Sequence, residues 1–173
     1  MSIHIIIDGY NLIRQSPSLS LLDHQEMQLG REALIDLLAK YKRVKHHKIT
    51  VVFDGTNALS FSGHRDYING IEIRFSRGGE SADTVIKKIA AGEKEKALVV
   101  SSDRDVADSA YLSGAAVIDS IEFEKKLEMA AYSDGFSVDG EDEGGWIPTT
   151  KKKGPSRKLP KKKRRSIAKI KKL

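Results

Sequence analysis

The sequence contains no cysteine, which excludes disulfide bonds, thiolate metal sites and a cysteine nucleophile. This absence fits a reducing compartment. No apolar run approaches the ~20 residues that a membrane-spanning helix needs, and no basic segment precedes the first apolar stretch. We therefore expect a cytoplasmic protein with no signal peptide and no membrane partner. A chain of 173 residues can bury a core without cross-links and is expected to form one domain with a tail.

Positive charge is scarce in most of the chain, although the formal net charge is +6. Residues 151–173 contain 13 of the 30 Lys and Arg residues and no acidic residue, which leaves residues 1–150 with 17 basic and 24 acidic residues. An acidic body with a basic tail indicates a polyanionic partner. The composition predicts a folded domain over residues 1–133, an acidic, glycine-rich linker over 134–150 and a basic disordered tail over 151–173.

The basic tail is a candidate tether to RNA or to the ribosome, because clusters of Lys and Arg bind phosphates by releasing counterions. No aromatic residue stands among the basic ones, so base stacking is not expected there. A solubilising tail without a partner and a nuclear localisation signal are the alternatives. The candidate RNA contacts in the tail are Lys151, Lys152, Lys153, Lys161, Lys162, Lys163, Arg164 and Arg165.

Apolar runs alternate with amphipathic segments along residues 1–131, which predicts strands alternating with helices. The predicted strands cover residues 3–7, 48–53, 70–75, 97–100 and 115–118. The predicted helices cover residues 23–43, 80–91, 106–113 and 121–131. Asp23 and Glu26 have the spacing of a capping box, the 70–75 strand alternates like an edge strand, and residues 15–20 and 56–70 are expected to be loops. This order indicates a three-layer α/β/α domain with a mainly parallel central sheet.

Acidic residues follow three strands that are expected to be buried. Asp8 ends the first strand, Asp54 follows the second, and Asp103 follows the third after two serines. The carboxyl ends of parallel strands meet at one edge of the sheet, where open α/β folds bind their ligands. The helix over 80–91 starts at the same edge. The carboxylates that this topology would gather are Asp8, Asp54, Glu80, Asp83, Asp103 and Asp105.

Several carboxylates in one cleft repel one another, so we expect a divalent cation to compensate their charge. Oxygen ligands suit Mg²⁺ or Mn²⁺, while the absence of cysteine and the scattered histidines argue against zinc. Such an ion beside an open groove favours hydrolysis of a phosphodiester by an activated water. The sequence lacks a P-loop and a dinucleotide-binding fingerprint, which argues against NTP and NAD. The alternative is that each acid only caps a helix or shapes a turn.

Several motifs in this sequence are similar to those of one known family. Ile6-Ile7-Asp8-Gly9-Tyr10-Asn11 resembles the N-terminal motif of NYN domains, which belong to the PIN-like nuclease superfamily. Four further motifs resemble the bacterial YacP-like branch, and they cover residues 31–38, 52–55, 80–83 and 101–105. The resemblance extends from about Ile3 to Ala131 and depends on the order and spacing of the whole set.

The resemblance implies a PIN-like fold and a Mg²⁺- or Mn²⁺-dependent endoribonuclease acting on single-stranded mRNA or rRNA. Some relatives act on ribosome-associated RNA, which makes the ribosome a further expected partner. Asn11 would orient Asp8 or contact the scissile phosphate. The implied core metal ligands are Asp8, Asp83 and Asp103, which Asp54, Glu80 and Asp105 would complete or flank. The candidate phosphate contacts in the domain are Arg31, Arg77 and Arg104.

Two other functions stay open. A non-catalytic RNA- or ribosome-binding protein on the same fold would bind RNA without a metal. The second alternative is an enzyme that acts on a small phosphate ester, but the sequence lacks the motifs of two families of such enzymes. A haloacid-dehalogenase-type phosphatase needs a second Asp where Tyr10 stands, and a toprim domain has Glu where Asp8 stands.

Overall fold

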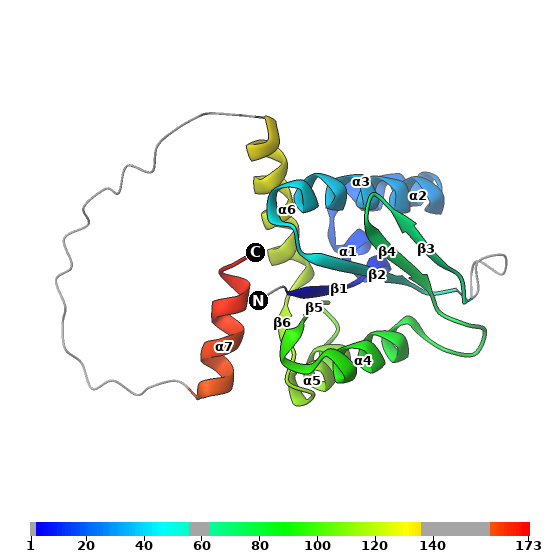
Figure 1. Cartoon of the computed structure of the whole chain (residues 1–173). Coiled ribbons are helices and arrows are strands. Elements are labelled where there is room, and N and C mark those ends of the chain that lie inside the picture. The colour runs from blue at the N-terminus through cyan, green and yellow to red at the C-terminus, as the bar shows by residue number, and fades with distance from the viewer. Residues whose placement is uncertain (1–2, 56–62, 136–159) are drawn as a thin grey trace, which may run out of the picture.

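Six strands form one sheet between two layers of helices in the computed structural model, which describes residues 3–55, 63–135 and 160–173 (Figure 1). The strands are β1 (His4–Asp8), β2 (Lys48–Phe53), β3 (Arg65–Ile68), β4 (Ile71–Phe75), β5 (Ala97–Val100) and β6 (Ala116–Ile118). Their order is β3-β4-β2-β1-β5-β6, and all neighbours are parallel except β3 and β4. The predicted α/β fold with a mainly parallel sheet is confirmed.

Helices cover both faces of the sheet (Figure 1). One face is covered by α1 (Gly9–Gln15), α2 (Pro17–Gln25), α3 (Met27–Lys45) and α6 (Ser120–Gly135). The other face is covered by α4 (Ala82–Glu93) and α5 (Arg104–Leu112), and a 3-10 turn (Lys94–Lys96) leads from α4 to β5. Ile5 and Ile7 point into the first layer and Ile6 into the second, so both faces of β1 are buried.

Strand β1 lies in the middle of the sheet and is paired on both sides. Asp8 is opposite Val52 of β2, and Ile7 is opposite Val100 of β5. The three strands therefore end at the same edge. The segments that follow them emerge side by side from this carboxyl edge of the sheet, as the apolar runs predicted.

Gly9 is required by a close contact and not by a turn. It is the first residue of α1, and its backbone does not have a positive φ angle. A Cβ atom added at Gly9 would lie 2.3 Å from Cε1 of Phe53, well inside van der Waals contact. The ring of Phe53 thus packs directly against the backbone that follows Asp8.

The start of the helical region differs from the sequence-based expectation. Residues 17–25 form α2, where a loop and then a capping box were predicted. The Ser16 hydroxyl accepts a hydrogen bond from the Leu19 N–H at 3.3 Å, and Pro17 occupies the first helical position. Helix α3 begins only at Met27, and its N-cap residue Glu26 makes no side-chain capping bond. Ser16 and Pro17 are a helix-start signal.

The strand over residues 70–75 was predicted to be an edge strand, but the edge strand on that side is β3. The segment expected to be a loop contains β3, which pairs with β4, while residues 56–62 lie outside the described part. Strand β4 is therefore internal, and Ile71, Glu72 and Ile73 are buried. All four residues of β3 are exposed, so a prediction based on buried apolar residues did not detect this strand.

The tail is not disordered at its end. Residues 161–170 form helix α7, which lies beside the amino ends of β5 and β6 (Figure 1). Leu173 is buried in the core, and its carbonyl accepts a hydrogen bond from the Tyr41 hydroxyl at 3.4 Å. Arg165 pairs with Glu95, and Lys169 donates to the Glu95 carbonyl.

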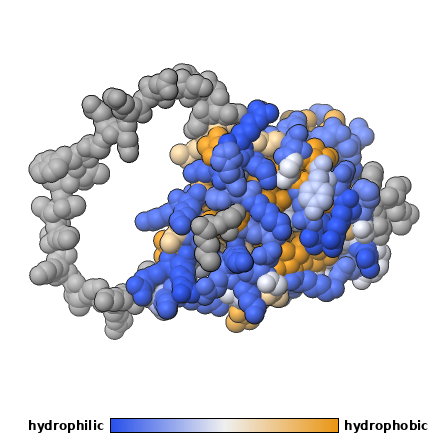
Figure 2. Space-filling view, in the orientation of Figure 1, coloured by the Kyte–Doolittle hydropathy of each residue, from blue (hydrophilic) through white to orange (hydrophobic). Residues whose placement is uncertain are grey.

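The prediction failed because the many lysines obscured a weak apolar pattern. Ile167 and Ile170 are three residues apart in α7, and Leu173 follows the helix at the same spacing. Apart from Ser166 and Ala168, the other residues of α7 are basic, and hydrophilic residues cover most of the helix in the view of Figure 2. Lys151, Lys152, Lys153 and the predicted 134–150 linker fall mainly in residues 136–159, outside the described part.

No helix in the described part of the chain is both long enough and apolar enough to cross a membrane.

The contact at Gly9 generates the first prediction. We expect Gly9→Ala to lower the free energy of unfolding by about 1–3 kcal/mol, because the added methyl group overlaps the Phe53 ring. Gly92→Ala is the matched control, because Gly92 lies in α4 with no atom near an added Cβ, and this change should raise stability by about 0.5–1 kcal/mol. Urea unfolding monitored by circular dichroism measures both. Equal effects of the two changes would contradict the prediction.

Candidate active site

Four of the six predicted carboxylates line one cleft at the carboxyl edge of the sheet. Asp8, Asp54, Asp83 and Asp103 surround a space of about 280 Å³. Each comes from a different element, since Asp8 ends β1, Asp54 follows β2, Asp83 lies in the first turn of α4, and Asp103 precedes α5. We call this space the acidic cleft. Its other lining residues are Tyr10, Asn11, Arg14, Gln15 and Ala82.

Asp8 is the most buried carboxylate of the acidic cleft. Burial raises the pKa of Asp8 to about 6, and the nearby Asp83 and Asp103 carboxylates act in the same direction. Two hydrogen bonds oppose this rise: the Asn11 backbone N–H donates to Asp8 Oδ1 at 3.2 Å, and the Ser101 hydroxyl donates to Oδ2 at 3.5 Å. Asp8 is therefore both the N-cap of α1 and the floor of the cleft.

Asp83 is half-buried and electrostatically coupled to its neighbours. Burial raises the pKa of the Asp83 carboxyl, and Asp103, Asp105 and Asp54 raise it further, while Lys87 lowers it. The charges of the acidic cleft thus repel one another across the gap between α4 and α5. A bound cation would relieve this repulsion.

Asp103 is exposed and is the N-cap residue of α5. Its Oδ1 accepts hydrogen bonds from the backbone N–H groups of Asp105 at 2.8 Å and Val106 at 3.2 Å. The Asp103 N–H in turn donates to the Ser101 hydroxyl at 3.1 Å. Because this hydroxyl donates to Asp8, Ser101 joins two carboxylate-bearing residues of the cleft.

Glu80 and Asp105 are not among the residues that line the acidic cleft. Glu80 forms an ion pair with Lys88, with 2.5 Å between Oε1 and Nζ. Asp105 pairs with Lys87 and is largely exposed. The structure therefore does not bring these two predicted ligands together with the other four.

Asn11 ties together three segments around the acidic cleft. Its side-chain oxygen accepts a hydrogen bond from the Ser102 N–H at 2.9 Å and another from the Ser120 hydroxyl at 2.7 Å. A backbone N–H can only donate, so the oxygen of the amide must face Ser102. Asn11 in α1 thereby fixes the loop before α5 and the start of α6.

The predicted arginine contacts lie in three different places. Arg31 lines a separate cavity and donates to the Tyr10 hydroxyl at 3.2 Å. Arg104 is exposed beside Asp103. Arg77 lies with Arg65, Arg74 and Lys88 in an open groove of about 630 Å³ between α4 and the β3–β4 pair. Glu80 and Glu93 also line this groove, which we call the basic groove because its cations outnumber its acids.

The sequence-based interpretation missed Arg14, the arginine that does line the acidic cleft. Its guanidinium carbon lies 5.9 Å from the centroid of the Tyr10 ring. Arg14 is three residues after Asn11 in the short helix α1, and this spacing places both on one side of a helix. A prediction of α1 would have revealed it.

The donor set of the acidic cleft fits a hard divalent cation in its chemistry. All four acids offer carboxylate oxygens, and burial, together with the neighbouring carboxylates, destabilises the anions of Asp8 and Asp83. In residues 3–55, 63–135 and 160–173, however, no three His, Asp or Glu side chains are arranged closely enough to hold one ion. The acidic cleft therefore suits a divalent cation by the type and charge of its side chains.

Comparisons with known proteins agree on one family. The model of the YacP-like NYN domain matches residues 5–172. A curated relative, the uncharacterized protein YacP of Bacillus subtilis (strain 168), is 29% identical over 86 residues, which are 50% of this chain. The match also spans only 50% of the length of that relative.

Two solved structures share the fold. The crystal structure of Rae1 (YacP) from Bacillus subtilis is 26% identical, has a TM-score of 0.65 and is matched over 77% of each chain. The structure of a single-substitution variant of Rae1 (YacP) is 24% identical, also with a TM-score of 0.65, over 76% of this chain and 78% of the other.

The raised pKa of Asp8 predicts a pH-dependent gain in stability from Asp8→Asn. The native state holds a proton on Asp8 up to about pH 6, whereas an unfolded Asp loses it near 3.8, so the native state loses stability as the pH rises between these values. In EDTA at pH 8 we expect Asp8→Asn to raise the free energy of unfolding by as much as about 3 kcal/mol. At pH 4 the free energy of unfolding should change little. Urea unfolding at the two pH values measures both.

Asp108→Asn in α5 is the matched control, because Asp108 is exposed on the far side of its helix from the buried Val106 and Ala110. It should change stability little at either pH. If Asp8→Asn gained nothing at pH 8, the predicted cost of the charge on Asp8 would be wrong.

Proposed function

This chain belongs to the YacP-like NYN domain family, and from that premise we propose that it is an endoribonuclease that hydrolyses single-stranded RNA. NYN domains are part of the PIN-like nuclease superfamily, whose members generally use divalent metals. The observation that carries the proposal is the acidic cleft itself. It gathers four carboxylates from four elements that are distant in sequence.

Helix capping alone does not explain why four acids from separate elements meet at one edge. Asp8 and Asp103 cap helices, and Asp83 lies in the first turn of α4, where the helix dipole favours an acid. Keeping Asp8 buried among other anions raises its pKa and costs stability. A cost of this kind is common where a protein binds a ligand of opposite charge.

We propose Asp8, Asp83 and Asp103 as the ligands of Mg²⁺ or Mn²⁺, with Asp54 at the edge of the site. When bound, such an ion would polarise the phosphodiester and lower the pKa of an attacking water. Glu80 and Asp105 would act only at a distance, through their pairs with Lys88 and Lys87.

Arg14 is our candidate for contacting the scissile phosphate. It is the cationic side chain among the residues that line the acidic cleft, and a guanidinium can donate two hydrogen bonds to a phosphate. Asn11 is a positioning residue in this proposal, because its side-chain oxygen is engaged by Ser102 and Ser120. It keeps Asp103 at a fixed place relative to Asp8.

Two basic surfaces could hold the rest of an RNA strand. The basic groove and the acidic cleft both reach the start of α4, since Glu80 lines the groove and Ala82 and Asp83 line the cleft. Helix α7 lies at the opposite end of the sheet and exposes Lys161, Lys163 and Arg164. We propose that the groove guides the strand towards the cleft and that α7 contacts a large particle such as the ribosome.

Cleavage of a long single-stranded RNA tests the proposal. We expect cleavage in Mg²⁺ or Mn²⁺, none in EDTA, and a loss of at least about 100-fold in Asp83→Asn, because one ligand of the ion is gone. Asp108→Asn is the matched control and should cleave like the wild type. The rate of product formation on denaturing gels measures all three.

Two results would contradict the nuclease. Undiminished cleavage by Asp83→Asn would show that another site, or a contaminant, cleaves the RNA. RNA binding without cleavage, both in free RNA and in translating ribosomes, would favour a non-catalytic binding protein on the same fold.

The place of Arg14 generates a separate prediction. Arg14→Gln should lower the rate of cleavage on the order of 100-fold, because a donor to the phosphate is lost where charge develops. Lys40→Gln, an exposed change on α3, serves as the control for lost positive charge. Single-turnover kinetics measure both. An unchanged rate in Arg14→Gln would exclude the proposed contact.

A further inference from the structure

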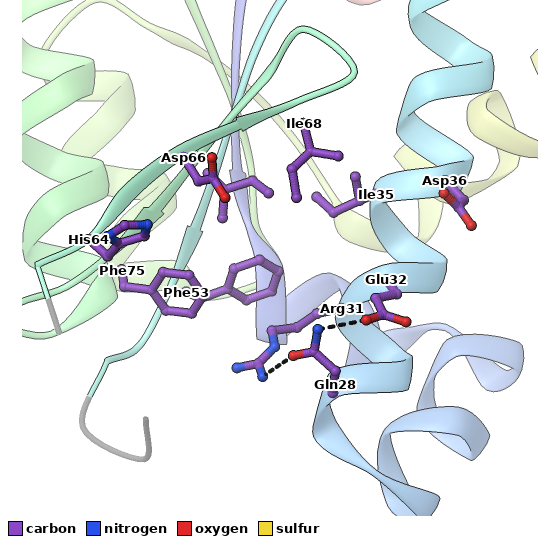
Figure 3. A pocket seen from close by; sticks show the side chains of 11 residues that line it. Gln28, Arg31, Glu32, Ile35, Asp36, Phe53, His64, Asp66, Ile68 and Phe75 are labelled. Carbon is purple, nitrogen blue, oxygen red and sulfur yellow. Dashed lines mark hydrogen bonds between the residues drawn. The ribbon is translucent and has the colours of Figure 1, made fainter. Parts of the chain in front are cut away.

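A second cavity, of about 200 Å³, lies between α3 and the ends of β2, β3 and β4 (Figure 3). It is distinct from the acidic cleft but close to the same carboxyl edge, because Phe53 and Phe75 are the last residues of β2 and β4. Its lining combines aromatic rings with hydrogen-bonding side chains. The polar residues of the lining are Gln28, Arg31, Glu32, Asp36, His64 and Asp66.

One wall of this cavity is aromatic. The rings of Phe53 and Phe75 are stacked, with 5.6 Å between their centroids and 28° between their planes. The guanidinium carbon of Arg31 lies 5.7 Å from the centroid of the Phe75 ring. Flat apolar surfaces and a planar cation therefore meet at one place (Figure 3).

Arg31 is held in position from two sides. Its Nη1 donates to the Tyr10 hydroxyl at 3.2 Å, and its Nη2 donates to Gln28 Oε1 at 2.6 Å. Gln28 in turn donates to Glu32 Oε1 at 2.7 Å. The polar side of the cavity is thus ordered by contacts within the protein.

Tyr10 connects the two cavities. It lines the acidic cleft, and its hydroxyl accepts the hydrogen bond from Arg31. Its ring also packs edge-on against Phe53, with centroids 5.1 Å apart. Tyr10 therefore lies between the acidic cleft and the aromatic wall, and the two spaces are neighbours that adjacent parts of one ligand can occupy.

We propose that this cavity, the base pocket, receives one unpaired nucleobase of an RNA strand whose neighbouring phosphodiester lies in the acidic cleft. Unpaired bases bind proteins by stacking on aromatic rings and guanidinium groups while their edges form hydrogen bonds. The cavity offers both kinds of contact. This inference rests on the proposed function, and it assigns Arg31 to the base and not to a phosphate.

The base pocket selects among the bases by its acceptors. Glu32, Asp36 and Asp66 are carboxylates that can only accept hydrogen bonds when ionised. Adenine, cytosine and guanine carry an exocyclic amino group that donates, whereas uracil presents two carbonyl oxygens beside its N–H. Bases with an amino group therefore bind more tightly than uracil.

Nuclear magnetic resonance of the full chain in EDTA tests this without cleavage. The probes are 5′-AMP, 5′-CMP, 5′-GMP and 5′-UMP, with ribose 5-phosphate as the compound that lacks a base. The first three should shift the side-chain N–H signals of Gln28 and Arg31, 5′-UMP should bind at least about fivefold more weakly, and ribose 5-phosphate should leave these signals in place.

Two variants locate the site. Phe75→Leu should weaken nucleotide binding about tenfold, in keeping with the worth of one aromatic–base stack. Gln28→Ala changes an exposed rim residue and removes an edge contact without altering the core, so it stays informative if Phe75→Leu does not fold. Tyr132→Leu is the matched control, because Tyr132 is an exposed aromatic residue on α6. It should bind like the wild type.

The outcomes separate this inference from the nuclease. Signals of Gln28 and Arg31 that do not move, or that move equally with ribose 5-phosphate, overturn the base pocket even if the wild type cleaves RNA. Equal binding of 5′-UMP overturns its selectivity. Base-dependent shifts that Phe75→Leu or Gln28→Ala weakens support the pocket, and they do so even if the chain cleaves no RNA.

Discussion

The pairing of β1 with a parallel strand on each side is the constraint on which the rest of this structure depends. Because β2 and β5 both run alongside β1 in register, their ends bring Asp54 and the Ser101–Asp103 loop to either side of Asp8. Helix α4 follows β4, which is parallel to β2, so α4 begins at the same edge and brings Asp83 there. The site is thus a result of strand order, and no single local motif could build it.

Two small features turn this shared edge into a defined site. Ser101 and Asn11 are hydrogen-bonded to backbone groups of the loop before α5, which fixes Asp103 relative to Asp8. On the other side of Tyr10, the absence of a side chain at Gly9 lets Phe53 approach the backbone. Phe53 therefore supports the floor of the acidic cleft and also forms part of the aromatic wall of the second cavity. Phe53 thus contacts the structure around both cavities.

Sequence patterns could predict the sheet and the four gathered acids because both follow from buried apolar runs. Strand β5 is apolar throughout and β1 has three consecutive isoleucines, and a parallel sheet places the carboxyl ends of such strands together. The same reasoning could not separate Glu80 and Asp105 from the other acids, since their pairing with Lys88 and Lys87 depends on side-chain directions.

Polar and basic segments were the least predictable. All four residues of β3 are exposed, so it lacks the alternating apolar pattern by which a strand is found. In α7 the two isoleucines are outnumbered by lysines and arginines, and only Ile170 packs against the core. The contact of Leu173 with Tyr41 joins residues that are far apart in sequence. The aromatic cavity was missed for the same reason, because its walls come from α3, β2 and β4.

Helix α7 has a consequence for how the molecule behaves as a charged body. It places a dense group of cations at the amino end of the sheet, while the carboxylates lie at the carboxyl end. These two groups contribute an electric dipole along the strands. In the field of a polyanion this contribution would turn the molecule so that α7 leads and the acidic cleft trails. First contact and reaction would then take place at opposite ends of the protein, and higher salt would slow the first more than the second.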